Sequence, residues 1–111
     1  MAARIDLDNL RLISGGDVEM EKELFLVFKE SSEVCINGLR SALAKGDDAE
    51  WKLQAHALKG NSFNLGAMVL GEICSKAQDA YKSPADEKQK LLVAIETELA
   101  NLQVELDKLA G

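Results

Sequence analysis

Apolar side chains recur every three or four residues along most of the chain, which is the spacing of one face of an α-helix. No segment shows the alternation of apolar and polar residues that is typical of a half-buried strand. The pattern predicts a short first helix and four longer ones, at about 5–14, 17–45, 48–65, 67–82 and 84–109. Because the connections are short, consecutive helices should run antiparallel. We therefore expect one all-α domain over 1–111: an antiparallel, up-and-down four-helix bundle with a short N-terminal helix lying across it.

Glycine and aspartate residues mark the expected helix ends. Asp17 is the predicted N-cap of the second helix, because a carboxylate at this position accepts hydrogen bonds from the free amide groups of the first turn. Gly46 is expected to end that helix in a left-handed conformation, and Asp47 or Asp48 should cap the next one. Gly66 predicts a break between the third and fourth helices.

The predicted core is built mainly from leucine and alanine, since aromatic residues make up only 5% of the chain. In the second helix the inward stripe is expected to comprise Met20, Leu24, Phe28, Cys35, Leu39 and Leu43, and in the third helix Trp51, Ala55, Leu58, Ser62 and Leu65. Cys35 and Cys74 do not form a CxxC pair and are expected to be buried free thiols. Because all the stripes face inward, we expect a monomer.

Composition and charge exclude several classes of function. Hydrophobic residues make up 47% of the chain and charged residues 29%, the balance of an ordinary globular domain. The net charge of −6 argues against nucleic-acid binding, which depends on neutralising phosphates. No apolar run approaches the ~18 residues of a membrane-spanning helix, and the first residues lack the apolar core of a signal peptide. A cytoplasmic location without membrane contact is therefore expected.

The third predicted helix contains the only histidine of the chain. On a helical wheel with Trp51 at zero, the core stripe lies within about 40° of zero, whereas His56 falls near 140° and Gly60 near 180°. The same outer side carries Lys52, Lys59 and Phe63, between about 80° and 120°. His56 is thus expected outside the core. Gly60 lies on the same outer side, although a glycine inside a helix costs about 0.5–1 kcal/mol relative to alanine.

This outer face combines features that suit phosphoryl transfer. An imidazole is largely neutral at cellular pH and is then nucleophilic. Gly60, four residues after His56, removes a side chain from the surface beside the ring, so another molecule can approach closely. Lys59 can place an ammonium group near an anion held on the ring. Phe63 is either an exposed aromatic in a docking patch or a residue buried at the end of the bundle, and the sequence favours neither.

The run AHALKGNSFNLGA at 55–67 resembles the phosphorylation-site motif of histidine-containing phosphotransfer (HPt) domains, which is close to HxLKGxSxxLGA. The matching positions are His56, Leu58, Lys59, Gly60, Ser62, Leu65, Gly66 and Ala67. The run ISGGDVEMEKELFLVF at 13–28 also looks like the usual start of the long second helix in that family. The resemblance extends over essentially the whole chain and implies a helical bundle that relays phosphoryl groups.

The resemblance also implies roles for individual residues. His56 would be the phosphoacceptor, Lys59 would stabilise the phosphoryl group, and Gly60 would give a receiver domain access. Gln78 matches a glutamine that hydrogen-bonds the other ring nitrogen in many family members. Phe63 departs from the family, in which a small residue is common at this position, and this difference is expected to affect partner choice together with Lys52.

The implied partners are receiver domains of response regulators and a hybrid histidine kinase. The chain is expected to be a phosphocarrier with no cofactor or metal of its own, and any magnesium would belong to the receiver. A P-loop, a kinase-type glycine loop and clustered metal ligands are all missing from the sequence. Two alternatives stay open: a helical adaptor that docks signalling proteins without carrying phosphate, and the phosphotransfer segment of a larger hybrid or chemotaxis-type kinase.

Overall fold

The computed structural model describes residues 4–110, and within this range it contains helices and no strand. In chain order the helices are α1 (Leu7–Ser14), α2 (Val18–Lys45), α3 (Asp48–Leu65), α4 (Met68–Asp79) and α5 (Ala85–Ala110). The predicted all-α fold is confirmed. The main difference in bounds concerns the fourth helix, which ends at Asp79 rather than near 82, because tight turns precede Pro84 and the residue before a proline disfavours the helical conformation.

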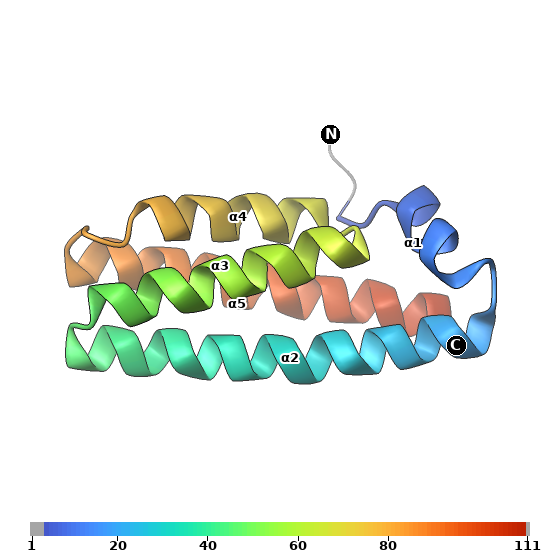
Figure 1. Cartoon of the computed structure of the whole chain (residues 1–111), viewed down its shortest axis with the longest axis horizontal. Coiled ribbons are helices and arrows are strands. Elements are labelled where there is room, and N and C mark those ends of the chain that lie inside the picture. Colours follow the sequence, from blue (N-terminus) through green and yellow to red (C-terminus); the bar gives the residue numbers. More distant parts are fainter. Residues whose placement is uncertain (1–3, 111) are drawn as a thin grey trace.

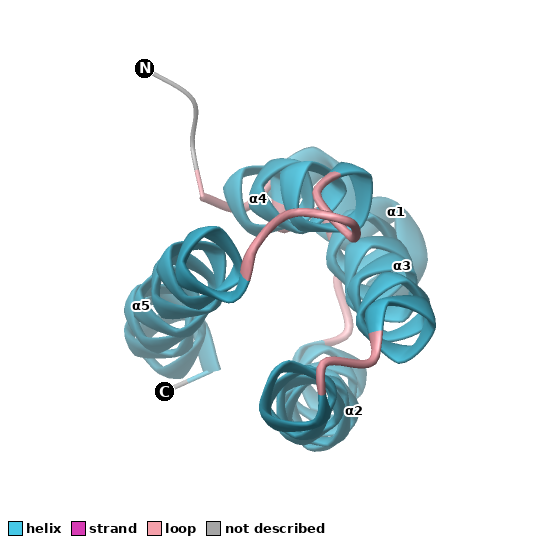
Figure 2. Cartoon of the chain, turned by 90° about the vertical axis from the view of Figure 1, so that its left-hand side faces the viewer, coloured by secondary structure: helices cyan, strands magenta, loops and turns pink. Residues whose placement is uncertain are grey.

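Helices α2 to α5 form an up-and-down bundle in which consecutive helices run antiparallel (Figure 1). Viewed along the bundle, α3 lies between α2 and α4, and α5 packs against both α4 and α2 (Figure 2). The short helix α1 lies at one end of the bundle, near the turn from α3 to α4. Apart from α1 at this end, no described helix covers the faces of α3 and α4 that point away from α2 and α5 (Figure 2).

The helix ends form where the sequence places aspartate and glycine. The Asp17 carboxylate accepts hydrogen bonds from the amide groups of Glu19 and Met20, at 3.0 and 3.2 Å. Gly46 ends α2 with a left-handed φ of 67°, and Asp47 then caps α3. The predicted caps of α2 and α3 are thus confirmed, because each depends on interactions between residues close in sequence.

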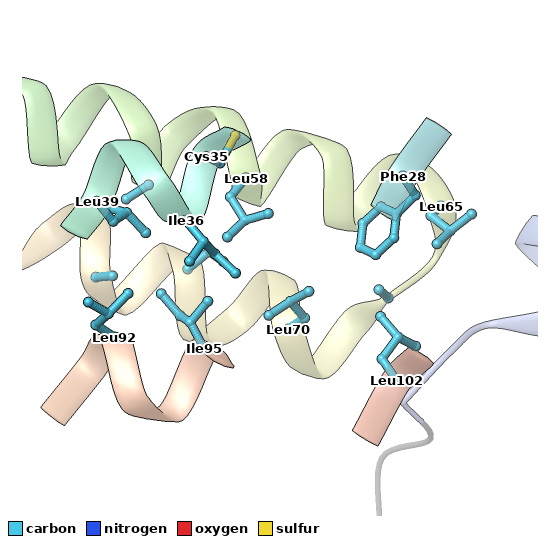
Figure 3. Packing of buried hydrophobic residues seen from close by; sticks show 14 of the residues in the cluster. Phe28, Cys35, Ile36, Leu39, Leu58, Leu65, Leu70, Leu92, Ile95 and Leu102 are labelled. Atoms are coloured by element: carbon cyan, nitrogen blue, oxygen red, sulfur yellow. The ribbon is translucent and has the colours of Figure 1, made fainter. Parts of the chain in front are cut away.

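The core lies between the four long helices, and Figure 3 shows part of its packing. Its fully buried members include Leu39, Trp51, Leu58, Leu70 and Ile95. The predicted stripe of α3 is buried throughout, and both cysteines are buried free thiols. Met20 is a correction: its side chain is 44% exposed, because α2 is ten residues longer than α3 and its first turns extend past the end of that helix.

Helix α1 and the residues just before it tie the end of the bundle together. The amide of Asp6 donates to the carbonyl of Gly66 at 2.7 Å, and the side chain of Asn9 donates to the carbonyl of Asn64 at 3.2 Å. Ile5 and Leu10 add apolar side chains to the core. These contacts hold the turn between α3 and α4. Within the described range, no helix is both long and apolar enough to cross a membrane.

Candidate functional site

Helix α3 presents His56 on the face opposite to the core. Ala55, Leu58 and Ser62 of the same helix are fully buried, whereas His56 is exposed. The buried stripe fixes the rotation of α3 about its axis. The imidazole is therefore held on the outer surface by the packing of the residues behind it.

Two contacts align α3 with α4 on either side of this histidine. Near the start of α3, Nε1 of Trp51 donates a buried hydrogen bond to the carbonyl of Ala77 at 2.8 Å. Near its end, the ring of Phe63 lies against Gly71 of α4. His56 lies between these two contacts along α3, and its Nδ1 is 3.3 Å from Oε1 of Gln78. The alignment of the two helices thus places an amide oxygen beside one nitrogen of the ring.

The contact with Gln78 selects one tautomer of the imidazole. An amide oxygen accepts hydrogen bonds but cannot donate them. The contact is a hydrogen bond only when Nδ1 carries the proton, and this leaves a lone pair on Nε2. The geometry therefore favours Nε2 of His56 as the nucleophilic nitrogen.

Gly60 leaves the surface one turn after His56 open. A Cβ atom built at this position would meet no heavy atom within 4 Å, and the glycine is exposed. Gly71 is different, because a Cβ atom there would overlap the ring of Phe63. The fold itself therefore gives no packing reason for a glycine at position 60.

Phe63 lies across the groove between α3 and α4. Its ring fills the space that the missing side chain of Gly71 leaves, yet 36% of the residue stays exposed. Both possibilities left open by the sequence are thus partly realised: the ring packs on the bundle and still contributes apolar surface to the face of His56.

Three lysines lie along the same face. Lys59, three residues after His56, is half-buried, and Lys52, four residues before it, is exposed. Nζ of Lys52 lies 4.5 Å from the centre of the Tyr81 ring, and Nζ of Lys82 lies 5.5 Å from it. Tyr81 and Lys82 follow the end of α4, so they adjoin Gln78. The face thus combines an imidazole, an open glycine and several ammonium groups.

Comparison with known proteins identifies the family. The sequence model of the Hpt domain matches residues 23–108, a range that includes His56 and Gln78. The chain belongs to the Hpt domain family. Membership indicates histidine phosphotransfer in phosphorelay signalling. A search of curated proteins gave no match.

The fold of this Hpt domain is similar to that of a solved structure. The crystal structure of histidine-containing phosphotransfer protein B (HptB) from Pseudomonas aeruginosa PAO1 superposes with a TM-score of 0.86. The similarity covers 97% of this chain and 95% of that one, at 24% sequence identity. At this identity the likeness establishes the shared fold.

The two cysteines of this Hpt domain lie in the core and do not reach the face of His56. Burial raises the pKa of the Cys74 thiol to about 12, and it also raises the pKa of Cys35. Both thiols lie in the core and are protonated at neutral pH. Among the described residues, no three His, Cys, Asp or Glu side chains group so that they could hold a metal ion.

Tyr81 and Lys82 are the site residues that the sequence did not point to. The sequence pattern gives neither residue a role at the site. Their place near His56 depends on the alignment of α3 with α4. The predicted contact of Gln78 with His56 could have located Lys82. In antiparallel helices, moving back one turn on one helix corresponds to moving forward one turn on the other, so residue 82 lies opposite residue 52.

Proposed function

We propose that this Hpt domain is a phosphorelay intermediate in which His56 accepts a phosphoryl group from the phosphoaspartate of a receiver domain and passes it to the aspartate of another. The observation that carries the proposal is the geometry at His56: an exposed ring with Nδ1 against the Gln78 amide oxygen, beside the open surface at Gly60. The proposed partners are a hybrid histidine kinase and receiver domains of response regulators, all in the cytoplasm.

The transfer step follows from the tautomer of His56, which has its proton on Nδ1 and a lone pair on Nε2. The lone pair on Nε2 attacks phosphorus, so a P–N bond forms while the P–O bond to the receiver's aspartate breaks. The aspartate leaves as a carboxylate, and the proton on Nδ1 stays hydrogen-bonded to Gln78. The reverse step returns the phosphoryl group to an aspartate. Gln78 acts as a positioning residue because it holds the tautomer without touching phosphorus.

In this step, Lys59 offsets the negative charge of the phosphoryl oxygens. Phosphoryl transfer needs positioning and stabilisation of the phosphoryl oxygens more than covalent participation by the protein. Lys59 follows His56 by three residues on α3, so its ammonium group can reach these oxygens. The chain then works as a phosphocarrier, since the receiver supplies both the phosphoryl group and any magnesium ion.

A panel of phosphorylated receiver domains tests the proposal. Each receiver is labelled from a small-molecule phosphodonor, freed of that donor and incubated with the chain. We expect at least one receiver to label the wild-type protein, with a bond that is acid-labile and stable in alkali, as a phosphoramidate is. His56→Gln should take up no label. Equal labelling of this variant would show that the phosphoryl group is carried elsewhere.

A further inference from the structure

Lys52 and Lys82 form a second cationic group on the face of His56, separate from Lys59. Their ammonium groups lie 4.5 and 5.5 Å from the centre of the same Tyr81 ring. Lys52 precedes His56 by one turn of α3, and Lys82 follows Gln78 by the same number of residues beyond α4. The ring therefore brings together two charges from different segments at one end of the site.

No ion pair among residues 4–110 neutralises these charges. The ion pairs of the described residues join Arg4 to Glu98 and Glu105, Lys22 to Glu19, Arg40 to Glu96, and Lys88 to Asp48. Neither Lys52 nor Lys82 takes part in any of them, and both side chains are exposed. Both lysines therefore remain available to an anion from outside.

The charge of the whole chain makes this local excess important. The protein carries a net charge of −6, so it repels an acidic partner at long range. A phosphorylated side chain adds a charge of about −1.5 to −2 at neutral pH. A partner that presents such a group to His56 therefore brings a negatively charged surface toward a protein that is itself acidic. Local cations beside the target offset the repulsion where contact occurs.

We infer that Lys52 and Lys82, held over Tyr81, are an electrostatic docking site for the acidic surface around the phosphoaspartate of the receiver. The inference rests on the proposed function and deepens it. Lys59, one turn after His56, acts on the transfer step, whereas Lys52 and Lys82 act on the association with the receiver that precedes it. Tyr81 limits the conformations of both lysines, so less entropy is lost when the partner binds.

The test separates the encounter from the transfer step. Transfer from a phosphorylated receiver is followed over a range of receiver concentrations, with wild type and with the double variant Lys52→Gln/Lys82→Gln. We expect the bimolecular rate constant to fall by about tenfold at low salt, because steering by local charge changes association rates by about 10-fold or more. The rate at saturating receiver should stay close to that of wild type, and the difference should shrink as salt screens the charges.

A matched variant controls for net charge. Lys29→Gln/Lys90→Gln removes two exposed lysines from α2 and α5, so both double variants change the net charge from −6 to −8. This control should keep a nearly wild-type rate constant. Tyr81→Leu should lower the rate constant at unchanged charge, whereas Tyr81→Phe, which keeps the ring, should not.

The outcomes distinguish this inference from the function on which it rests. If wild type and Lys52→Gln/Lys82→Gln have the same bimolecular rate constant, or if the control loses as much, the docking site is refuted while transfer to His56 stands. A lower saturating rate with an unchanged bimolecular constant would equally refute it. If no receiver labels wild type, both proposals fail.

Discussion

The ring of Phe63 occupies the space that a side chain at position 71 would fill. An aromatic residue on α3 and a glycine on α4 are thus matched in size, across the groove that also brings Gln78 to His56. The large residue that departs from the usual family pattern is accommodated by the absence of a side chain opposite to it.

This pairing predicts strong coupling between the two positions. Gly71→Ala should lower the free energy of unfolding by about 1–3 kcal/mol, because the new methyl group overlaps the ring. In a Phe63→Ala background the same change should be neutral or stabilising by up to about 1 kcal/mol, since alanine favours the helix. Urea unfolding of the four proteins measures the coupling, and additive effects would contradict the match.

At Gly60 stability and function should move in opposite directions. The position is open, so Gly60→Ala should raise the free energy of unfolding by about 0.5–1 kcal/mol. Gly60→Leu should fold normally yet slow transfer from a receiver by about 100-fold, because displacing a partner by even ~1 Å has effects of this size. Phosphorylation by phosphoramidate, a small donor, should remain in both variants and serves as the control. Unimpaired transfer to Gly60→Leu with a native circular dichroism spectrum would disprove the role in access.

The contact of Gln78 with the ring can be tested without a partner. In wild type the proton should reside mainly on Nδ1 of His56, because the amide oxygen accepts from it. In Gln78→Leu the neutral ring is free to carry its proton on either nitrogen. Nitrogen NMR of the single histidine reports the two populations directly. We expect the Nδ1–H population and the saturating transfer rate to fall together, and a fall in rate with an unchanged tautomer would exclude positioning as the cause.

The buried ammonium group of Lys88 predicts an asymmetry between two substitutions. Lys88 is 4% exposed, pairs with Asp48 and lies 5.6 Å from the centre of the Trp51 ring. Asp48→Asn should cost about 1–3 kcal/mol of stability, because it leaves the buried charge without its carboxylate. Lys88→Met should cost less, since the half-exposed Asp48 regains water. Thermal unfolding compares them, and a larger loss for Lys88→Met would show that an unpaired ammonium group at this position is not the costlier state.

The raised pKa of Cys74 predicts a loss of stability in alkali. Burial favours the protonated thiol, so the pKa lies at about 12 in the folded protein against 9.0 for the free group. This contribution is fully present below pH 9, where both states hold the proton, and it is lost progressively as pH rises from 9 toward 12. The free energy of unfolding should fall less steeply above pH 9 in Cys74→Ala. Identical pH profiles would show that the thiol ionises as easily in the folded protein.

The sequence predicted those parts of the structure that depend on neighbours along the chain. Asp17 and Asp47 cap helices through amide groups two or three residues away, so their roles are readable locally. The outer position of His56 followed from the buried stripe on the same helix. The exposure of Met20 could not be read in this way, because it depends on the relative lengths of α2 and α3.

Contacts between helices were harder to predict because they depend on alignment. Nothing in the local sequence around Gly71 shows that it faces Phe63, and nothing around Tyr81 shows that Lys52 reaches it. Only the family resemblance suggested Gln78 as a partner of His56. Once two contacts fix the alignment of α3 with α4, the other neighbours follow from helical geometry.

The central claim is that Nε2 of His56 carries the phosphoryl group, and its most direct test is a proton–nitrogen NMR correlation of the ring after incubation with a phosphorylated receiver. The chain has one histidine, so the spectrum reports His56 alone. We predict phosphorus coupling at Nε2 with Nδ1 free of phosphorus. Coupling at Nδ1, or an unchanged ring in a protein that has taken up label, would contradict the account.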